Sequence, residues 1–386
     1  MDLAINETQQ MLKNSAREFF ARECPLSLVR AMEELPKGYT DELWQGMVDL
    51  GWLGLALPEK YGGAGGDLMD VAALLEEMGR ALMPGPFFST VVLGAMTILD
   101  AADEDNKEKL LSQIANGQLI VTLALTEING TYDPEGIEVS ARVDGNGYVI
   151  NGTKLFVPDA QASDLLIVAT RTSQTFNPKE GVTLLLVPKG TDGVRITPHE
   201  TLPSGAQGEV RFNEARVPFS ATLGGKDMGW PIIERTLRRA AAAKCVEMVG
   251  GAQAVLDMTL KYLKYRAQFG RPLGTFQSLQ HHCANMATDV EGCRYTAYQA
   301  IWRVARSPQA DREVSIAKAW VSDAYIRICA LAHQCHGAIG FTKEHDLQMY
   351  THRARIQEQA FGDSRVHRKV LSNNLGDLHY LGRTES

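Results

Sequence analysis

The chain has 386 residues, of which 45% are hydrophobic and 22% are charged, and its formal net charge is −7. This composition is typical of a soluble globular protein with two or three domains, and it excludes a disordered chain. The acidic balance, without a basic stripe of interleaved aromatic residues, argues against a nucleic-acid-binding protein.

The sequence predicts a cytoplasmic protein without membrane insertion. No run of 18 apolar residues occurs, so no transmembrane helix is expected. The first residues carry acids and lack the apolar core of a secretory signal. The six cysteines show no C-x-x-C pair and no disulfide-like spacing, which favours a reducing compartment. No metal site is predicted.

Residues 1–118 have the periodicity of helices. Asn6 is the expected cap of the first helix, and Glu7 lies in its first turn. The predicted buried face of this helix comprises Met11, Leu12, Ala16, Phe19 and Phe20. The glycine-rich stretch ALPEKYGGAGGD, residues 56–67, has no following G-K-[ST], so we interpret it as a connector rather than a P-loop.

Residues 119–229 change to short, β-branched segments bounded by Gly, Asn, Asp or Pro. This pattern predicts a central antiparallel β-barrel or sandwich. Asp144-Gly145 and Asn151-Gly152 predict two hairpin-like turns in this region.

Residues 230–386 are predicted to be helical again. A long first helix is followed by helical segments at 276–305, 311–337 and 344–360, several of them apolar on more than one side. This favours a four-helix bundle that also makes subunit contacts. Because strands never alternate with helices, the predicted class is α+β multidomain, without a parallel dinucleotide-binding sheet.

Five local motifs follow one another in the order found in one enzyme family. They are ALPEKYGGAGGD (56–67), LALTEINGTYD (123–133), NGTKLFV (151–157), YRAQFGRPLGTFQSLQHHCANM (265–286) and QCHGAIGF (334–341). Together they resemble the acyl-CoA dehydrogenase family along nearly the whole chain. The resemblance implies FAD held between the β-domain and the helices of two subunits, and a tetramer assembled through the bundle. It also implies α,β-dehydrogenation of an acyl-CoA thioester, with electrons passed to an electron-transferring flavoprotein.

The resemblance also implies which residues contact FAD. Thr126 would lie near the flavin N5 and O4 edge, and Phe156 would form an aromatic wall against the isoalloxazine. Arg266 would reach the pyrophosphate of the neighbouring subunit's FAD, since a guanidinium fork suits paired phosphate oxygens. The remaining implied contacts are Phe269, Leu273, Gln277, Gln334 and Gly337. Each residue also has an ordinary interpretation, as core packing or as a solvated helix end.

Two departures from the family pattern affect the expected flavin contacts. Tyr132 stands where many relatives have a serine, and Pro158 stands where a hydroxyl residue is common. The flavin contacts are therefore expected to be fewer or redistributed.

The family's catalytic base is absent from both of its usual positions. The reaction needs a carboxylate that removes the proton α to the thioester carbonyl while the β-hydrogen leaves as hydride. In many relatives this is a Glu in a Y-E-G step, and the equivalent position here is Phe361. In others it lies on the first long helix of the bundle, and that position is Ala240. Neither side chain accepts a proton.

Glu247 is the predicted base. It follows Ala240 by seven residues on the same helix, which places it on the same side about two turns further along. The alternative is a structural acid paired with Lys244 or with an arginine of a partner chain. Asp363 and Glu358 are lesser candidates. The small residues 250–252 (Gly, Gly, Ala) leave space beside Glu247, which indicates a bulky or long acyl chain.

The empty base positions also favour a second class of function. The chain is then a base-lacking structural or cofactor-completing subunit of a heteromeric dehydrogenase. The segments RALMPGPFFSTVVLG (80–94) and FGDSRVHRKVL (361–371) resemble the branch containing pimeloyl-CoA and steroid side-chain dehydrogenases, where such pairs occur. A flavin-free binding module is a third possibility, disfavoured because Arg266, Phe269 and Gln334 are retained.

Overall fold

The chain forms two compact units in a computed structural model, which describes residues 5–33, 35, 37–200, 206–307 and 309–374. The first unit comprises Met1–Leu26, Leu68–Met83 and Ala241–Ser386, and the second comprises Ser27–Asp67 and Pro84–Ala240. Residues 1–4 and 375–386 of the predicted outer domains lie outside the described residues. Across the described residues, no helix has both the length and the apolar character needed to cross a membrane.

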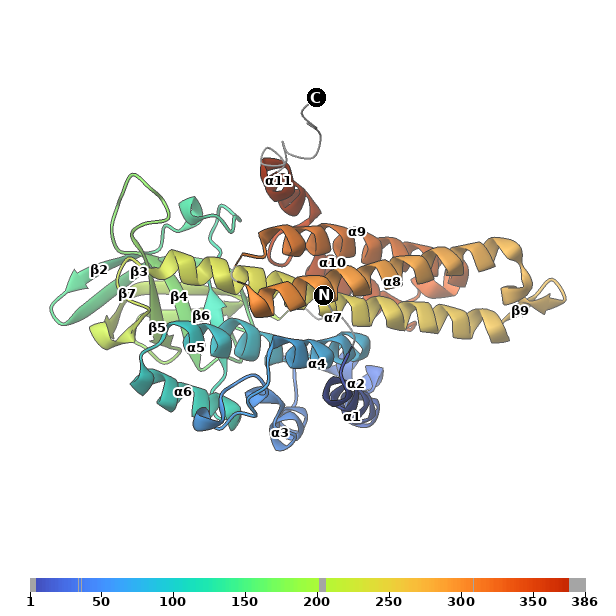
Figure 1. The fold of residues 1–386 in the computed structure, drawn as a ribbon, viewed down its shortest axis with the longest axis horizontal. Coiled ribbons are helices and arrows are strands. Elements are labelled where there is room, and N and C mark those ends of the chain that lie inside the picture. Colours follow the sequence, from blue (N-terminus) through green and yellow to red (C-terminus); the bar gives the residue numbers. More distant parts are fainter. Residues whose placement is uncertain (1–4, 34, 36, 201–205, 308, 375–386) are drawn as a thin grey trace, which may run out of the picture. The chain divides into compact units, whose positions relative to one another are not determined.

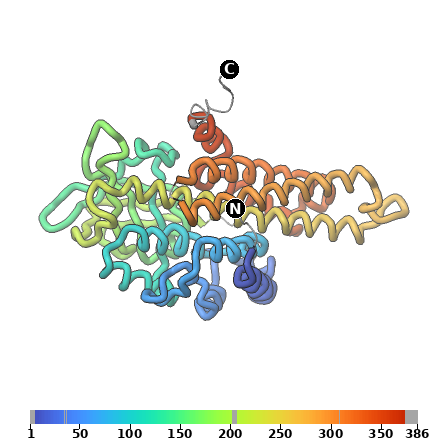
Figure 2. Tube along the Cα trace, in the orientation of Figure 1, coloured from blue at the N-terminus to red at the C-terminus, as the bar shows by residue number. Residues whose placement is uncertain are grey.

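The first unit is helical, and its core lies among long helices (Figure 1). Its elements are α1 (Glu7–Glu23), α4 (Leu68–Ala81), α7 (Gly229–Tyr265, in this unit from residue 241), β9 (Ala267–Gln268), β10 (Arg271–Pro272), the 3-10 turns η6 (Leu273–Thr275) and η7 (Gly337–Phe341), α8 (Gln277–Arg306), α9 (Asp311–His336), α10 (Leu347–Gln359) and α11 (Ser364–Asn374). Figure 2 follows the chain along α7, around the β9–β10 hairpin and back along α8. The predicted C-terminal helical domain is confirmed, and α11 is an additional helix that the sequence pattern did not predict.

The second unit combines short helices with one sheet. Its helical elements are α2 (Leu26–Met32), α3 (Asp41–Asp49), η1 (Trp52–Gly54), η2 (Glu59–Tyr61), the π-helix η3 (Phe88–Ala95), α5 (Met96–Ala101), α6 (Glu104–Ala115), η4 (Pro134–Gly136) and η5 (Phe219–Ala221). Its strands are β1 (Val121–Ala124), β2 (Ser140–Asp144), β3 (Gly147–Pro158), β4 (Leu165–Arg171), β5 (Val182–Pro188), β6 (Val194–Pro198), β7 (Gln207–Pro218) and β8 (Thr222–Leu223).

The sheet has the strand order β6-β7-β3-β2-β4-β5-β8, with β1 pairing alongside β4. The predicted central β-domain is confirmed, but the barrel alternative is wrong. Strands β6 and β8 stand at opposite ends of the order, and no ladder joins them in the described residues, so the sheet is open and sandwich-like. Most pairs are antiparallel, whereas β1 runs parallel to β4.

One of the two predicted turns is confirmed and the other is wrong. Asp144 pairs with Gly147, so Gly145 and its neighbour form a two-residue hairpin turn, with φ of +60° at Gly145. Asn151-Gly152 instead lies inside β3, where the register against β7 shifts between Ile150 and Gly152. Because β3 pairs with β2 on one edge and with β7 on the other, Asn151-Gly152 forms a β-bulge within the strand instead of a turn.

Helix α1 begins as the sequence predicts, but its buried face is different. Asn6 accepts a hydrogen bond from the backbone N–H of Gln9, and the Gln9 side chain bonds back, forming a capping box. Met11, predicted to be buried, is 65% exposed. Lys13 is buried in its place. The cause is an ionic partner on another helix, which hydrophobic periodicity does not report.

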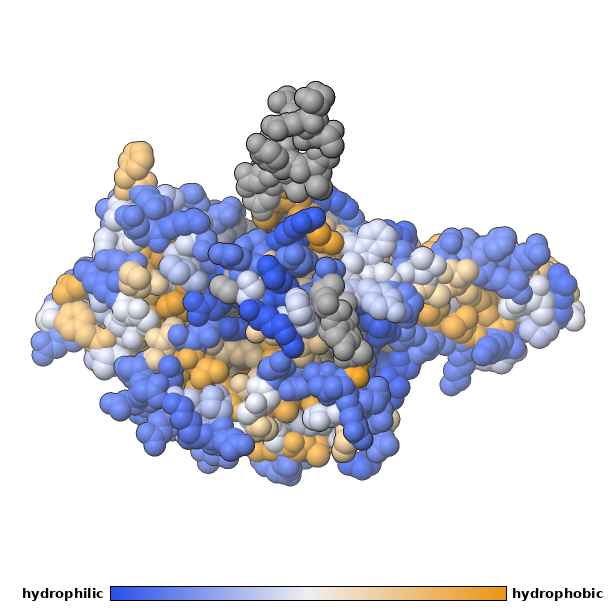
Figure 3. Space-filling view, viewed as in Figure 1, coloured by the Kyte–Doolittle hydropathy of each residue, from blue (hydrophilic) through white to orange (hydrophobic). Residues whose placement is uncertain are grey.

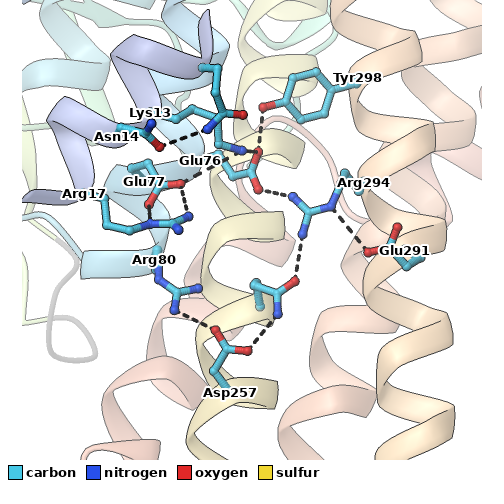
Figure 4. Close-up of polar contacts among 12 residues, drawn as sticks. Lys13, Asn14, Arg17, Glu76, Glu77, Arg80, Asp257, Glu291, Arg294 and Tyr298 are labelled. Carbon is cyan, nitrogen blue, oxygen red and sulfur yellow. Dashed lines mark hydrogen bonds and ion pairs between the residues drawn. The ribbon is translucent and has the colours of Figure 1, made fainter. Parts of the chain in front are cut away.

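Lys13 belongs to a buried network of ion pairs among α1, α4 and α8 (Figure 4). Its ammonium lies 2.5 Å from Oε2 of Glu76, and the Tyr298 hydroxyl donates to the same oxygen at 2.6 Å. Arg294 donates to the other oxygen. Burial by itself would raise the pKa of Glu76, but Lys13 and Arg294 bring that pKa below its ordinary value. Glu76 is therefore an ionised, fully partnered carboxylate inside the helical unit.

Helices α4 and α7 cross at backbone contact distance. A Cβ placed at Gly250 would lie 1.7 Å from the carbonyl oxygen of Glu76, and one at Gly79 would lie 1.8 Å from that of Glu247. A Cβ at Gly251 would lie 2.2 Å from the hydroxyl of Tyr325. The expectation that residues 250–252 leave room for an acyl chain is therefore wrong, since α4 and α9 fill the space that the two glycines vacate.

The buried ion pair generates the first prediction. Lys13→Met leaves the buried Glu76 carboxylate without one of its two cationic partners, so we expect the free energy of unfolding to fall by about 3 kcal/mol. Arg22→Met is the control, because Arg22 of the same helix pairs with Glu23 with both side chains exposed, and we expect less than about 1 kcal/mol there. Urea denaturation measures both, and equal losses would contradict the prediction.

The helix crossing generates the second prediction. Gly250→Ala forces α4 and α7 apart, and we expect it to lower the free energy of unfolding by about 2 kcal/mol or more. Gly292→Ala in α8 is the control, since its new methyl meets only the indole edge of Trp320, at 3.1 Å and beyond. We expect the control to stay within about 1 kcal/mol of wild type in urea denaturation. A tolerated Gly250→Ala would show that the crossing is loose.

Candidate active site

The second unit brings together the two residues expected at the flavin ring. Thr126 follows β1, and its carbonyl oxygen accepts a hydrogen bond of 2.8 Å from the backbone N–H of Leu155. Phe156 is the next residue, and its side chain is 51% exposed. Its φ of +54° is rare for an aromatic residue, and it coincides with a register shift between Lys154 and Val157. The surrounding strands therefore hold Phe156 in a strained conformation, half exposed beside Thr126.

A buried ion pair supports this surface, and the sequence analysis did not find it. The Lys154 ammonium is fully buried and lies 2.6 Å from Oε1 of Glu127 and 2.9 Å from the carbonyl oxygen of Leu125. The Glu127 carboxylate also accepts the backbone N–H groups of Glu138 and Val139, at 3.0 and 3.1 Å. The signal available in the sequence was an acid directly after Thr126 and a lysine two residues before Phe156.

His199 is a second residue that sequence reasoning missed. Its Nε2 accepts the backbone N–H of Phe156 at 3.4 Å, and the two rings lie 5.2 Å apart at an angle of 37°. His199 therefore contacts both the backbone and the ring of Phe156.

The first unit carries the remaining predicted cofactor contacts, all of them at least partly accessible. The backbone N–H of Leu273 donates to the carbonyl oxygen of Arg266 at 2.8 Å, which closes the hairpin between them. The Arg266 side chain is exposed and forms no ion pair within the described part of the chain. Phe269, at the hairpin tip, is 88% exposed with φ of +55°. Apolar surface also shows on the visible face of the bundle toward this hairpin (Figure 3).

The C-terminal end of α9 lies beside the C-terminal end of α7. The rings of His336 and Tyr262 stack with their centroids 4.5 Å apart, and Tyr262 precedes Arg266 by four residues. Gln334 is exposed on α9, and Gly337 has φ of +65° with open space where a Cβ would project. Gln277, also exposed, is the first residue of α8.

Taken one by one, these groups have the chemistry that parts of a flavin dinucleotide require. The Arg266 guanidinium suits phosphate oxygens, the amides of Gln334 and Gln277 suit hydroxyls, and Gly337 permits close approach of the backbone. The Phe156 ring offers a flat aromatic face in the other unit.

Glu247, the predicted base, is held by polar side chains on both carboxylate oxygens. Its side chain is 7% exposed. The Lys244 ammonium lies 2.5 Å from Oε2, and the Gln357 amide donates to Oε1 at 2.8 Å. The Arg353 guanidinium lies 3.8 Å from Oε1. Glu247 thus connects α7 to Gln357 of α10, which precedes Phe361 by four residues.

The other residues considered for the base have defined surroundings. Ala240 is fully buried in α7, and Phe361 lies between α10 and α11 with φ of +59°. Asp363 accepts the backbone N–H of Val366 at 2.9 Å, which makes it the N-terminal cap of α11. Glu358 lies 3.4 Å from the Arg355 guanidinium.

Comparison with known proteins decides the family. Sequence profiles of the acyl-CoA dehydrogenase N-terminal, middle and C-terminal domains match residues 6–118, 122–215 and 227–376. The chain belongs to the acyl-CoA dehydrogenase family. Its members are flavoproteins and oxidoreductases that act on the CH–CH group of acyl-CoA thioesters.

Three relatives illustrate the range of the family. The chain is 30% identical over 384 residues to the probable acyl-CoA dehydrogenase YngJ of Bacillus subtilis, covering 97% of this chain and all of the relative. It is 28% identical to the caffeyl-CoA reductase-Etf complex subunit CarC of Acetobacterium woodii, covering 96% of this chain and 99% of CarC. The structure matches a chain of the ChsE4-ChsE5 complex of Mycobacterium tuberculosis with a TM-score of 0.89 and 28% identity, covering 98% and 99% of the two chains.

The buried Lys154 generates a prediction about pH. Burial lowers the pKa of Lys154 from the ordinary 10.5 to about 8, against the opposing effect of Glu127. Between these values the unfolded chain binds a proton that the folded chain does not, so the contribution of Lys154 to the free energy of unfolding rises with pH. We expect the difference in urea stability between wild type and Lys154→Met to shift in favour of wild type from pH 8 to pH 10. A constant difference would contradict the lowered pKa.

Proposed function

We propose that the chain catalyses FAD-dependent α,β-dehydrogenation of an acyl-CoA thioester to the trans-2-enoyl-CoA in the cytoplasm. The observation that carries this proposal is the half-exposed Phe156 beside Thr126, held by the buried pair of Glu127 and Lys154. A strained, accessible aromatic residue on a buried ionic support is a preorganised surface for a flat ligand. FAD held at Thr126 and Phe156 would supply the acceptor for the β-hydrogen, which leaves the thioester as hydride.

Each half of the chain contributes to holding the cofactor in this proposal. Thr126 and Phe156 contact the flavin ring of this chain's FAD, and Arg266 binds, as a bidentate donor, the pyrophosphate of a neighbouring subunit's FAD. Contacts to the remainder of FAD come from Phe269, Leu273, Gln277, Gln334 and Gly337. The exposure of Arg266 and Phe269 in the single chain supports a site completed by another subunit of a tetramer.

Electron transfer to an electron-transferring flavoprotein is part of the proposal. CarC, which is 28% identical to this chain, is by its name a subunit of a reductase-Etf complex. Reduced flavin in this chain would pass its electrons to a partner of the same class.

Glu247 is the proposed base, because it is the acid on the predicted face of α7, and its carboxylate contacts Gln357 of α10. To act, the carboxylate must exchange a contact with Lys244 or Gln357 for the α-proton of the thioester.

Both carboxylate oxygens of Glu247 already have polar partners, and this favours a second candidate function. In this alternative the chain is the base-lacking subunit of a heteromeric dehydrogenase, and Glu247 only connects α7 to α10. The ChsE4-ChsE5 complex, whose structure matches at a TM-score of 0.89, is by its name an assembly of two different chains. The partner chain would then supply the carboxylate of the working site.

One experiment separates the two functions. The purified chain is mixed anaerobically with short, branched, dicarboxylic and steroidal acyl-CoA thioesters, and the flavin absorbance is followed. Glu247→Gln is compared with Glu358→Gln, an acid of α10 whose contact is a surface arginine. We expect one thioester class to bleach the flavin of the wild-type chain. Bleaching should be at least 100-fold slower in Glu247→Gln, whereas Glu358→Gln should bleach at the wild-type rate.

Other outcomes have defined meanings. Equal bleaching in wild type and Glu247→Gln would remove Glu247 as the base. Bound flavin that no thioester bleaches would support the base-lacking subunit, and a co-purifying homologous chain would then be sought by mass spectrometry. A folded chain that binds no flavin, alone or with such a partner, would contradict both functions.

A further inference from the structure

Two cysteines of the helical unit are in contact, and the proposed reaction uses neither of them. Cys283 lies in the second turn of α8 and Cys335 lies in the last turn of α9, and the two helices pack against each other. The two thiols form a side-chain hydrogen bond, and both are free thiols in this structure. Because the two positions are far apart in the sequence, the spacing of the cysteines does not reveal this pair.

The two thiols differ in their access to solvent. Cys283 is half-buried, and the two residues that follow it, Ala284 and Asn285, are exposed. Cys335 is only 4% exposed, and His336 after it is also buried. A small oxidant that arrives from solvent therefore meets the sulfur of Cys283 first.

The hydrogen bond between the thiols gives them different roles. Burial raises the pKa of both, and it raises that of Cys335 to about 12. The hydrogen bond lowers the pKa of Cys283 and raises that of Cys335, as expected where Cys335 donates its proton to Cys283. Cys283 is therefore the first of the two to ionise, and the thiolate is the reactive form of cysteine.

A covalent bond between these sulfurs needs only a local adjustment. The sulfurs of a disulfide lie about 2 Å apart, which is closer than two hydrogen-bonded thiols. Cys335 lies at a helix end, since α9 ends at His336 and Gly337 has φ of +65°. Helix ends fray, and the half-buried side chain of Cys283 has room to rotate. The sulfurs can therefore approach each other while the middle of each helix stays in place.

We propose that Cys283 and Cys335 are a modification site at which hydrogen peroxide forms a reversible disulfide between α8 and α9. The deprotonated sulfur of Cys283 attacks one peroxide oxygen, the O–O bond breaks, and the other oxygen leaves as water. The sulfur of Cys335 then attacks the sulfenic acid of Cys283, loses its proton and displaces a second water. The two thiols lose two electrons, which reduce one peroxide to two waters, and a dithiol reductant restores both thiols.

The disulfide would restrain the end of the bundle that carries two of the proposed cofactor contacts. Gln277 begins α8 in front of Cys283, and Gln334 directly precedes Cys335. A cross-link between the two helices opposes local opening of both helix ends. The reaction of the thiols requires no flavin, so this proposal goes beyond the proposed function and does not depend on it.

The first experiment identifies the cross-link. The full chain is treated with hydrogen peroxide, digested without reductant and analysed by mass spectrometry. We expect a peptide pair joined through Cys283 and Cys335, lighter by two hydrogen atoms than the reduced peptides. It should be absent after treatment with dithiothreitol and absent from Cys283→Ser. Failure to form this cross-link would overturn the proposal.

A second cysteine pair of the same bundle is the matched control. Cys245 of α7 lies near enough to Cys293 of α8 to raise its pKa, but both side chains are 0% exposed. We expect at least tenfold less cross-linking there, because buried thiols without access are inert. Equal cross-linking of the two pairs would show that the chain reacts after unfolding, and it would also overturn the proposal.

Two variants test the roles of the two thiols. In Cys335→Ser the sulfenic acid of Cys283 has no second thiol to react with, so we expect labelling of Cys283 by dimedone to rise at least tenfold over wild type. In Cys283→Ser we expect Cys335 to stay unlabelled, because its thiol is buried. Labelling of Cys335 in place of Cys283 would overturn these roles, and either variant serves if the other does not fold.

Amide hydrogen exchange tests the restraint on the helix ends, in the chain without flavin or thioester. Oxidation should slow exchange at residues 278–285 and 332–338 of wild type, while peroxide-treated Cys283→Ser exchanges like reduced wild type. A complete cross-link with unchanged exchange would overturn the restraint. A cross-linked chain that never binds flavin would support the site and contradict only the proposed function.

Discussion

The close crossing of α4 and α7 is the constraint on which the rest of the helical unit depends. Gly79 and Gly250 bring the two backbones together, since a methyl group at either position would overlap a carbonyl group of the other helix. At this distance the side chains beside the crossing have little room. Glu76 of α4 then meets Lys13 and Arg294 in a buried network, because a carboxylate inside a tight crossing needs nearby cations.

The same crossing determines what Glu247 can do. Its backbone carbonyl faces Gly79, and its carboxylate is directed to Lys244 and to Gln357 of α10. Helix α10 is thereby fixed at the end that leads into the turn at Phe361. Lys318, a buried lysine of α9, donates to backbone carbonyl groups of the same turn, so the turn is held from two helices, α7 and α9. A carboxylate with partners on both oxygens must give up one of them before it can reach a substrate, which is a physical reason for considering a heteromer.

The β-containing unit follows a similar principle with different residues. Lys154 and Glu127 form a buried pair under the surface that we propose binds flavin, much as Lys318 supports the turn in the helical unit. In both places a buried ammonium bonded to backbone carbonyl groups supports a residue with positive φ, Phe156 or Phe361. The free energy of burying these charges is offset by hydrogen bonds that define the geometry of a site.

The sequence by itself determined the order of the helical and strand regions and the family. The cap at Asn6 and the periodicity of the long helices are short-range features, and the ordered motifs carry the family resemblance without any coordinates. Only the tertiary structure decided that Lys13 replaces Met11 in the core, that α4 fills the space beside Gly250, and that the Glu247 carboxylate is engaged by α10. The physical reason is separation along the chain. Glu76 lies 63 residues from Lys13, and Gln357 lies 110 residues from Glu247, and local patterning carries no information about which distant group a charged side chain will meet.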